Sequence, residues 1–136
     1  MHAIRVLTSL AVLTSVAATA EAQKTHEIQL EVNREKEIYR FSPSRVTAAP
    51  GDVLVFKVIN GAPHSIVFEA EGLSPATRSA LSAALGARSG ELGSSMITKD
   101  GAEYRLVLPK IPAGTYSYFC LPHRAYDMRG EIVVKK

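Results

Sequence analysis

This 136-residue sequence has no tryptophan and only one cysteine, Cys120. One cysteine excludes an intramolecular disulfide, a cysteine-rich zinc site and an iron–sulfur cluster held by cysteines. The sequence also lacks an internal repeat, and its length is that of one domain. A single packed core without a second domain is therefore expected.

The sequence also lacks a large excess of charge of either sign. It has 16 basic and 13 acidic residues, which gives a net charge of +3, and the basic residues are scattered along the chain. Because nucleic-acid binding requires a basic stripe or cluster, no nucleic acid is expected among the partners. The content of charged and hydrophobic residues is ordinary for a globular chain, which argues against wholesale disorder.

Long hydrophobic runs are absent except near the N-terminus. Arg5 is followed by an uncharged apolar stretch, residues 6–20, and by small residues that end at Ala22. This order is typical of a secretory signal peptide, so residues 1–22 are predicted to be removed and residues 23–136 to form the mature domain. The stretch is short for a membrane span, which needs about 20 apolar residues. We expect a periplasmic or extracellular protein without stable membrane insertion; a retained anchor helix is the alternative.

The mature chain has the pattern of short strands with one exposed face. Ile28, Leu30 and Val32 alternate with charged or polar residues, and the β-branched run 53–59 suits a central strand. Strands are predicted at residues 26–32, 38–41, 45–48, 53–59, 65–69, 96–98, 103–108, 116–120 and 131–135. Separated by turns rich in Pro and Gly, they indicate an all-β fold, an antiparallel Greek-key β-sandwich.

One segment departs from the strand pattern. A Ser-Pro pair at positions 74–75 provides an N-cap and first turn, and an Ala-rich run then continues through Leu85 to Gly86. Leu81 and Leu85 share one face at helical spacing. We expect a short helix on one edge of the sandwich, within an inserted loop of residues 71–95.

One short loop carries three kinds of metal-binding side chain. Cys120, His123 and Met128 follow one another at Cys-x2-His-x4-Met spacing between two predicted strands. His64 lies at an earlier strand end, and it can meet this loop because the loops of a sandwich gather at its two ends. Two imidazoles, a thiolate and a more distant thioether are the ligands of a blue copper electron-transfer centre.

Each of these residues also has a purely structural interpretation. A lone cysteine is commonly a buried small hydrophobe, and isolated histidine or methionine residues are commonly turn or core residues. An unpaired thiol in an oxidising compartment is a hazard unless it is buried or ligated, so the spacing around Cys120 favours a ligand. His26 is expected at the surface, Met96 in the core, and the aromatic residues before Cys120 in core packing that shields the metal.

Several motifs in a fixed order carry a resemblance to a known family. They are Tyr39-x-Phe41-x-Pro43, Gly51-Asp52 with Phe56, Asn60-x-x-Pro63-His64-x-Ile66-x-Phe68, the run Gly114 to His123, and Met128-x-Gly130-x-Ile132-x-Val134. The chain resembles the small blue (type 1) copper proteins, the plastocyanin/azurin (cupredoxin) family, with plastocyanin- or pseudoazurin-like ligand spacing. The resemblance implies one copper ion bound by His64, Cys120, His123 and Met128, and one-electron transfer between larger redox partners.

The resemblance also implies a monomeric electron carrier rather than an enzyme, with transient partners such as a c-type cytochrome or a copper enzyme. Electron entry is expected at the edge of His123, which is ringed by small apolar residues of the two ligand loops. Arg124 and Arg129 would bias docking towards an acidic surface. Two positions depart from the family pattern: Ser65 stands where relatives often have Asn, and Asp127 stands where many have Gly.

Two other functions stay open on the residues alone. A copper carrier that delivers metal to another protein would share the ligands, although an open site rich in Met and His is expected of a carrier. A hydrolase would use Cys120 and His123 as nucleophile and base. That alternative lacks a strand-to-helix elbow and leaves Met128 unexplained.

Overall fold

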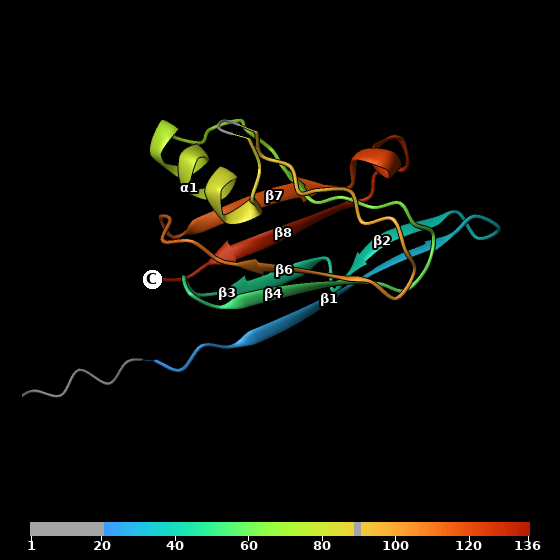
Figure 1. The fold of residues 1–136 in the computed structure, drawn as a ribbon, viewed down its shortest axis with the longest axis horizontal. Helices are drawn as coiled ribbons and strands as arrows, with labels where there is room; N and C mark the ends of the chain where they lie inside the picture. The colour runs from blue at the N-terminus through green and yellow to red at the C-terminus, as the bar shows by residue number, and fades with distance from the viewer. Residues whose placement is uncertain (1–20, 89–90) are drawn as a thin grey trace, which may run out of the picture.

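Alternating apolar residues build two facing sheets in the computed structural model, which describes residues 21–88 and 91–136 (Figure 1). The elements are β1 (Thr25–Asn33), β2 (Ile38–Ser42), β3 (Arg45–Ala48), β4 (Val53–Val58), β5 (Val67–Phe68), α1 (Pro75–Leu85), β6 (Glu103–Val107), β7 (Gly114–Phe119), the 3-10 helix η1 (Leu121–Tyr126) and β8 (Arg129–Val134). One sheet has the order β2-β1-β4-β6 and the other β3-β8-β7-β5. The predicted β-sandwich is confirmed.

Strand pairing is mixed rather than antiparallel throughout. β1 runs parallel to β4, with Ile28 opposite Phe56, and β3 runs parallel to β8, with Val46 opposite Ile132. The other strand pairs are antiparallel. The expectation of a purely antiparallel sandwich does not hold for those two pairs. The reason is that alternation fixes which face of a strand is buried but not the direction of its neighbour.

The core between the sheets is centred on an aromatic cluster around Tyr118. The ring centroids of Phe41, Phe56 and Phe68 lie 4.8, 5.6 and 5.8 Å from that of Tyr118, the first two in edge-to-face geometry. Tyr118 is fully buried and stands two residues before Cys120 on β7. Packing of this ring therefore fixes the strand that presents the thiol, as expected for the aromatic residues before the cysteine.

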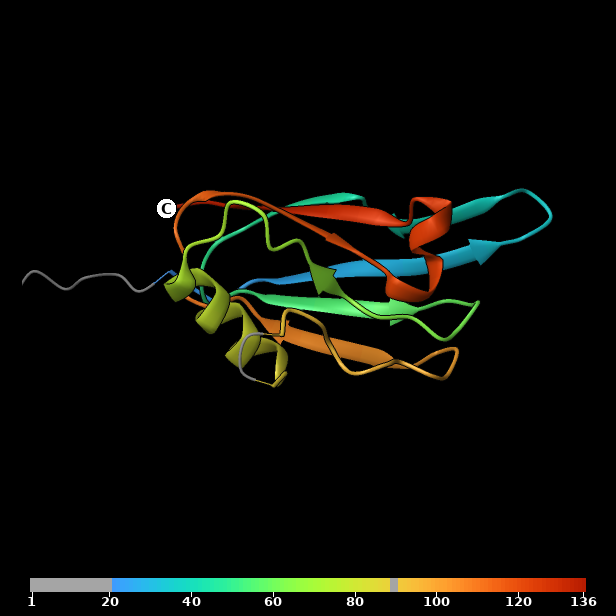
Figure 2. The ribbon, with the colours of Figure 1, turned by 90° about the horizontal axis from the view of Figure 1, so that it is seen from above.

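The inserted helix forms where the sequence predicts it. Ser74 caps the N-terminus of α1 through its side chain, and Gly86 ends the helix in the left-handed region at φ 65°. α1 lies along the edge of the sandwich beside β6 (Figure 2). There the Tyr104 hydroxyl donates a hydrogen bond to the Leu85 carbonyl at 3.0 Å. The helix thus covers one open edge of the sandwich.

Three sequence predictions about single residues or short segments are wrong. Residues 96–98 form no strand, and the pairing there is an isolated bridge between Ile97 and His64. Met96 is 45% exposed rather than part of the core. His26 is half-buried rather than on the surface, because its ring contacts Asp52.

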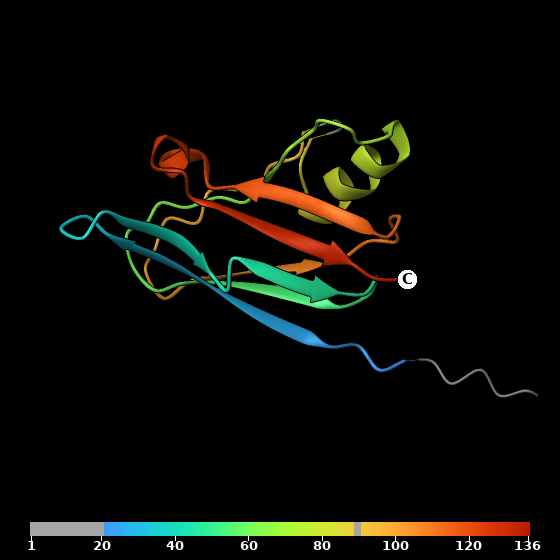
Figure 3. The same cartoon turned by 180° about the vertical axis from the view of Figure 1, so that it is seen from behind.

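The predicted signal peptide, residues 1–22, falls almost wholly outside the described residues. Within the described ranges, no helix has the length and apolarity of a membrane span. The C-terminus and the start of β1 lie at the end of the sandwich opposite η1 (Figures 1 and 3).

A buried carboxylate ties the start of β1 to the turn between β3 and β4. Asp52 accepts hydrogen bonds from the backbone N–H groups of Lys24 and Ala49 at 3.0 and 3.1 Å, and its Oδ2 lies 2.9 Å from His26 Nε2. The hydrogen bond from His26 contributes most to lowering the pKa of Asp52, which falls from 3.8 to about 2 although burial opposes the change. Folding therefore favours the ionised carboxylate.

We predict that Asp52→Asn lowers the free energy of unfolding at pH 7 by about 1–3 kcal/mol, because the amide accepts these bonds less well. The folded-state pKa is depressed, so the stabilisation is complete above 3.8 and is lost as the pH falls towards about 2. Urea unfolding at pH 7 and pH 3 should therefore show a smaller difference between wild type and variant at the lower pH. A difference independent of pH would contradict this account, and Glu27→Gln on the exposed face of β1 is the control.

Candidate metal centre

Three donor atoms from two separate loops converge at one end of the sandwich. His64 lies in the loop after β4, whereas Cys120 directly follows β7 and His123 lies in η1. Cys120 Sγ is 3.6 Å from His64 Nδ1 and 3.4 Å from His123 Nδ1, and one donor atom from each residue lies within 4.8 Å of the others. His64 and Cys120 are fully buried, and His123 is 7% exposed. The fold thus brings together three of the four residues selected from the sequence.

Met128, the fourth selected residue, is fully buried and its backbone lies beside this cluster. The Met128 carbonyl accepts a hydrogen bond from Cys120 N–H at 3.0 Å, and Met128 N–H donates to the His123 carbonyl at 3.4 Å. The turn of η1 and the left-handed Asp127 at φ 57° reverse the chain between His123 and β8. The Cys-x2-His-x4-Met segment therefore closes into a compact loop.

Asn60 fixes the orientation of the His64 ring. The Asn60 carbonyl, which can only accept, lies 2.8 Å from His64 Nε2, so Nε2 carries the hydrogen and Nδ1 turns its lone pair towards Cys120. Asn60 Oδ1 in turn accepts a hydrogen bond from Val32 N–H at 2.7 Å. Gly61 has φ 70°, and a Cβ there would overlap Val32. The loop that carries His64 is thus tied closely to β1.

The segment after the inserted helix supports His64 from another side. His64 and Ile97 exchange backbone hydrogen bonds of 2.9 and 2.8 Å. Ser94 N–H donates to the Ile66 carbonyl, and Ser94 Oγ accepts from Ile66 N–H at 3.0 Å. These contacts could not be predicted from the sequence, since backbone pairing by a loop leaves no distinctive side-chain pattern. The end of the inserted segment thus has a structural role at the site.

Burial favours the uncharged forms of the three donors. It lowers the pKa of His64 and that of His123, on which the nearby charges of His64 and Arg34 have a smaller effect in the same direction. Burial also raises the pKa of the Cys120 thiol, against smaller opposing hydrogen bonds from the backbone of Ser65 and of His123. Neutral imidazoles present lone pairs to a cation, and the thiol releases its proton when a metal binds.

The two residues that depart from the family pattern have different consequences. Ser65 still links the two ligand loops, because its Oγ accepts a hydrogen bond from Leu121 N–H at 3.1 Å. Asp127 places no carboxylate in the buried site: its side chain is 85% exposed and accepts a hydrogen bond from Arg129 Nε at 2.7 Å. A polar tie between the loops is therefore retained, and the carboxylate lies in solvent.

Two tyrosines that the sequence analysis did not select as site residues cover one side of His123. The rings of Tyr39 and Tyr126 stack with centroids 4.1 Å apart and planes 8° from parallel. The Tyr39 ring lies 5.6 Å from that of His123. Tyr126 is 59% exposed, and Leu121 on the same loop is 54% exposed. The surface around the His123 edge is therefore aromatic and apolar.

Of the two arginines expected to make this surface basic, one is neutralised by carboxylates and the other is not. Arg129 donates to the carboxylates of both Glu69 and Asp127. Arg124 lies over the Phe119 ring, with its guanidinium carbon 4.3 Å from the ring centroid. Two carboxylates on one guanidinium more than balance its charge, so Arg129 offers no attraction to an acidic partner.

The chemistry of the donors fits copper. A thiol and two neutral imidazoles meet in a buried space, and a thioether residue adjoins them in the fold. Thiolate and thioether groups are soft ligands that suit Cu(I), and imidazole suits both copper oxidation states. Structural zinc sites use sulfur from cysteine rather than methionine, so the adjoining Met128 favours copper.

Comparisons with known proteins also indicate a copper-binding protein. The sequence model of copper binding proteins of the plastocyanin/azurin family matches residues 26–135. Plastocyanin from Nostoc punctiforme is 29% identical over 132 residues, which cover 97% of this chain and 91% of that protein. Plastocyanin A/B from Petroselinum crispum is 33% identical over 95 residues, which cover 69% of this chain and 86% of that protein.

Solved structures show the same fold. Oxidised plastocyanin from Dryopteris crassirhizoma has a TM-score of 0.61 at 23% identity, covering 81% of this chain and 100% of its own. A mutant of reduced amicyanin has a TM-score of 0.54 at 23% identity, covering 84% and 85%. Because the family model spans almost all of the described residues, the chain belongs to the plastocyanin/azurin family of copper-binding proteins.

Proposed function

We propose that the protein carries one electron at a time between larger redox proteins, with His64, Cys120, His123 and Met128 as the ligands of one type 1 copper ion. The convergence of His64 Nδ1, Cys120 Sγ and His123 Nδ1 in a buried space carries this proposal. Copper, when bound, supplies the one-electron couple. The chain supplies the ligands, their fixed orientation and the exclusion of water.

The surroundings of the ligands favour fast electron exchange. Asn60 orients His64, Ser65 ties the two ligand loops together, and the Cys120–Met128 backbone bond closes the second loop. Ligands held by such bonds have little freedom to rearrange when the charge at the site changes. A small rearrangement keeps the barrier to electron transfer low, which is what a carrier requires.

The closed site argues against the two alternatives. Catalytic metal sites keep an open position for substrate, whereas here His64, Cys120 and Met128 are fully buried and His123 is only 7% exposed. A hydrolase needs an accessible nucleophile, yet Cys120 is fully buried and burial raises its thiol pKa. A carrier that hands over metal needs an exposed ligand set. We therefore propose a non-enzymatic electron carrier.

The compartment and the partners follow from the same proposal. The leader pattern of residues 1–22 supports export to the periplasm or beyond. Partners such as a c-type cytochrome or a copper enzyme would dock briefly on the apolar surface around His123, where Leu121, Pro122 and Tyr126 are exposed. A small apolar surface suits weak, short-lived complexes of a monomeric carrier.

We predict that Cys120→Ser abolishes the intense thiolate-to-copper absorption of the copper-loaded protein, because a serine hydroxyl is not a soft charge-transfer donor. Visible and EPR spectra after addition of Cu(II) measure this. Wild type should show the intense band and a narrow copper hyperfine splitting. A colourless wild-type protein whose thiol titrates freely would overturn the proposed function.

Met128→Leu should raise the reduction potential, because removing a weak thioether donor destabilises Cu(II) more than Cu(I). Voltammetry on the copper-loaded protein measures the shift. Met96→Leu is the matched control, since Met96 is exposed and should leave the potential unchanged. Identical potentials for the two variants would remove Met128 from the ligand set.

Leu121→Asp should slow electron exchange with a c-type cytochrome by about tenfold or more, because a charge at the centre of an apolar contact weakens docking. Val107→Asp is the control: Val107 on β6 is 53% exposed and Leu121 is 54% exposed. Stopped-flow rates at fixed ionic strength compare the two variants. Equal rates for both would place the docking surface elsewhere on the molecule.

A further inference from the structure

The net charge of the predicted mature chain is concentrated at one end of the sandwich. Lys24, Lys110, Lys135 and Lys136 lie around the turn between β3 and β4, and all four are exposed. Asp52, the acidic residue of this turn, is buried. Within residues 23–136 the remaining basic and acidic residues number eleven each. The excess of +3 therefore belongs to these four lysines, which we name the lysine pole.

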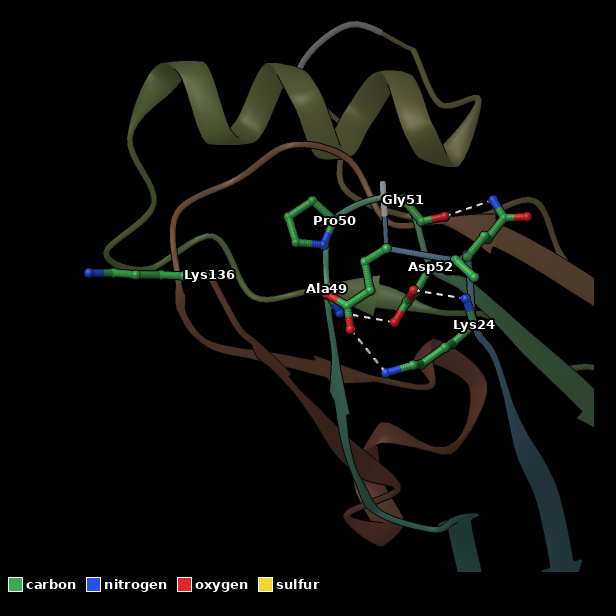
Figure 4. Close-up of a pocket in the computed structure, with 9 residues that line it drawn as sticks. Lys24, Ala49, Pro50, Gly51, Asp52 and Lys136 are labelled. Carbon is green, nitrogen blue, oxygen red and sulfur yellow. Dashed lines mark hydrogen bonds and ion pairs between the residues drawn. The ribbon is translucent and has the colours of Figure 1, made fainter. Parts of the chain in front are cut away.

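Backbone contacts hold the four lysines around the same turn. Lys24 N–H donates to Asp52 Oδ1 at 3.0 Å, and Lys135 N–H donates to the Ala48 carbonyl at 2.9 Å. Leu108 exchanges hydrogen bonds of 2.8 Å with Gly51 and Asp52, which places the following loop, with Lys110, beside the same turn. Lys24 and Lys136 line one surface hollow with residues 49–52 (Figure 4).

The lysine pole faces away from the metal centre. β4 and β7 both begin at the pole and run towards the loops with His64 and Cys120. Six residues of extended strand span about 20 Å. A partner bound at the pole would lie far from the donors, so binding there positions the protein rather than exchanging electrons with it.

Predicted removal of the leader increases the charge of the pole. Lys24 Nζ lies 3.3 Å from Glu21 Oε1, and both side chains are well exposed. Glu21 belongs to the predicted signal peptide of residues 1–22. Cleavage after Ala22 would take away this carboxylate and leave the charge of Lys24 without it. The exported form would therefore have the more positive pole.

We propose that the lysine pole binds the anionic headgroup surface of a phospholipid membrane, so that the protein moves along the membrane with its metal centre facing outward. Lysine is depleted from protein–protein interfaces, which argues against an acidic protein as the partner. Its flexible ammonium group acts as a point charge that suits fluid headgroups. Binding of this kind is peripheral and electrostatic, without insertion.

The test compares two variants of equal net charge. Lys110→Gln/Lys135→Gln/Lys136→Gln removes three charges from the pole, and Lys36→Gln/Lys57→Gln/Lys99→Gln removes three elsewhere. Copper-loaded exported protein, with its N-terminus determined by mass spectrometry, is sedimented with vesicles of phosphatidylglycerol and phosphatidylcholine, and with pure phosphatidylcholine. Each lysine near an anionic membrane strengthens binding by about fivefold. The pole variant, which lacks three of them, should therefore bind the anionic vesicles about 100-fold more weakly than wild type.

Support for the proposal requires that the control variant retain most of the wild-type binding, that pure phosphatidylcholine bind none of the proteins, and that salt weaken binding. Equal losses in the two variants would overturn it, because binding would then follow net charge alone. The proposal would also be overturned if the wild-type protein failed to bind anionic vesicles but was retained on immobilised polyglutamate. That result would indicate an acidic protein surface as the partner. An unchanged copper spectrum in both variants shows that the site is intact.

Discussion

The structure depends on one constraint, which is that the Cys120 thiol must be held in a dry space against two imidazole nitrogens from different loops. Burying three polar donors is unfavourable unless hydrogen bonds or a metal satisfy them. Asn60 satisfies the outer nitrogen of His64, and the backbone of Ser65 and of His123 bonds to the thiol. The Nδ1 atoms of the two histidines and the Cys120 sulfur then contact one another and, on the proposed function, bind copper. The arrangement of both loops follows from this requirement.

The sandwich provides the stiffness that the loops need. Tyr118 locks β7 into the aromatic core two residues before the thiol, and Ile97 pairs with the backbone of His64. The inserted segment thus has an identifiable part at the site, since its last residues brace the loop of His64 while α1 covers the edge beside β6. A rigid frame of this kind explains how one small domain can hold the three donors His64, Cys120 and His123 together without a disulfide.

The sequence predicts the parts of this structure that depend on local chemistry. The helix is predictable because a Ser-Pro start, an Ala-rich run and a terminal glycine act within a few residues. The Cys-x2-His-x4-Met loop is recognisable because its donors are neighbours in the chain. Other features join segments that are distant in the sequence: the parallel pairing of β1 with β4, the Tyr39–Tyr126 stack and the His26–Asp52 contact. The alternation of apolar and polar residues along a strand does not identify such partners. The exposure of Met96 is unpredictable for the same reason, because an apolar side chain alone does not show whether another segment covers it.

The two ends of the molecule have different tasks, partner exchange at one end and attraction to an anionic surface at the other. These two tasks would conflict if one surface performed both. An electron carrier must release its partner quickly, and a strongly charged docking face would prolong each encounter with an oppositely charged partner. The charge of Arg129 is balanced by Glu69 and Asp127, so Arg124 is the cation that remains of this pair beside the apolar and aromatic surface around His123. The excess positive charge lies instead at the lysine pole, where β4 and β7 begin. Attraction to an anionic surface there does not slow the release of a redox partner from the surface around His123. Such separation makes retention near a membrane and rapid turnover of partners independent of each other.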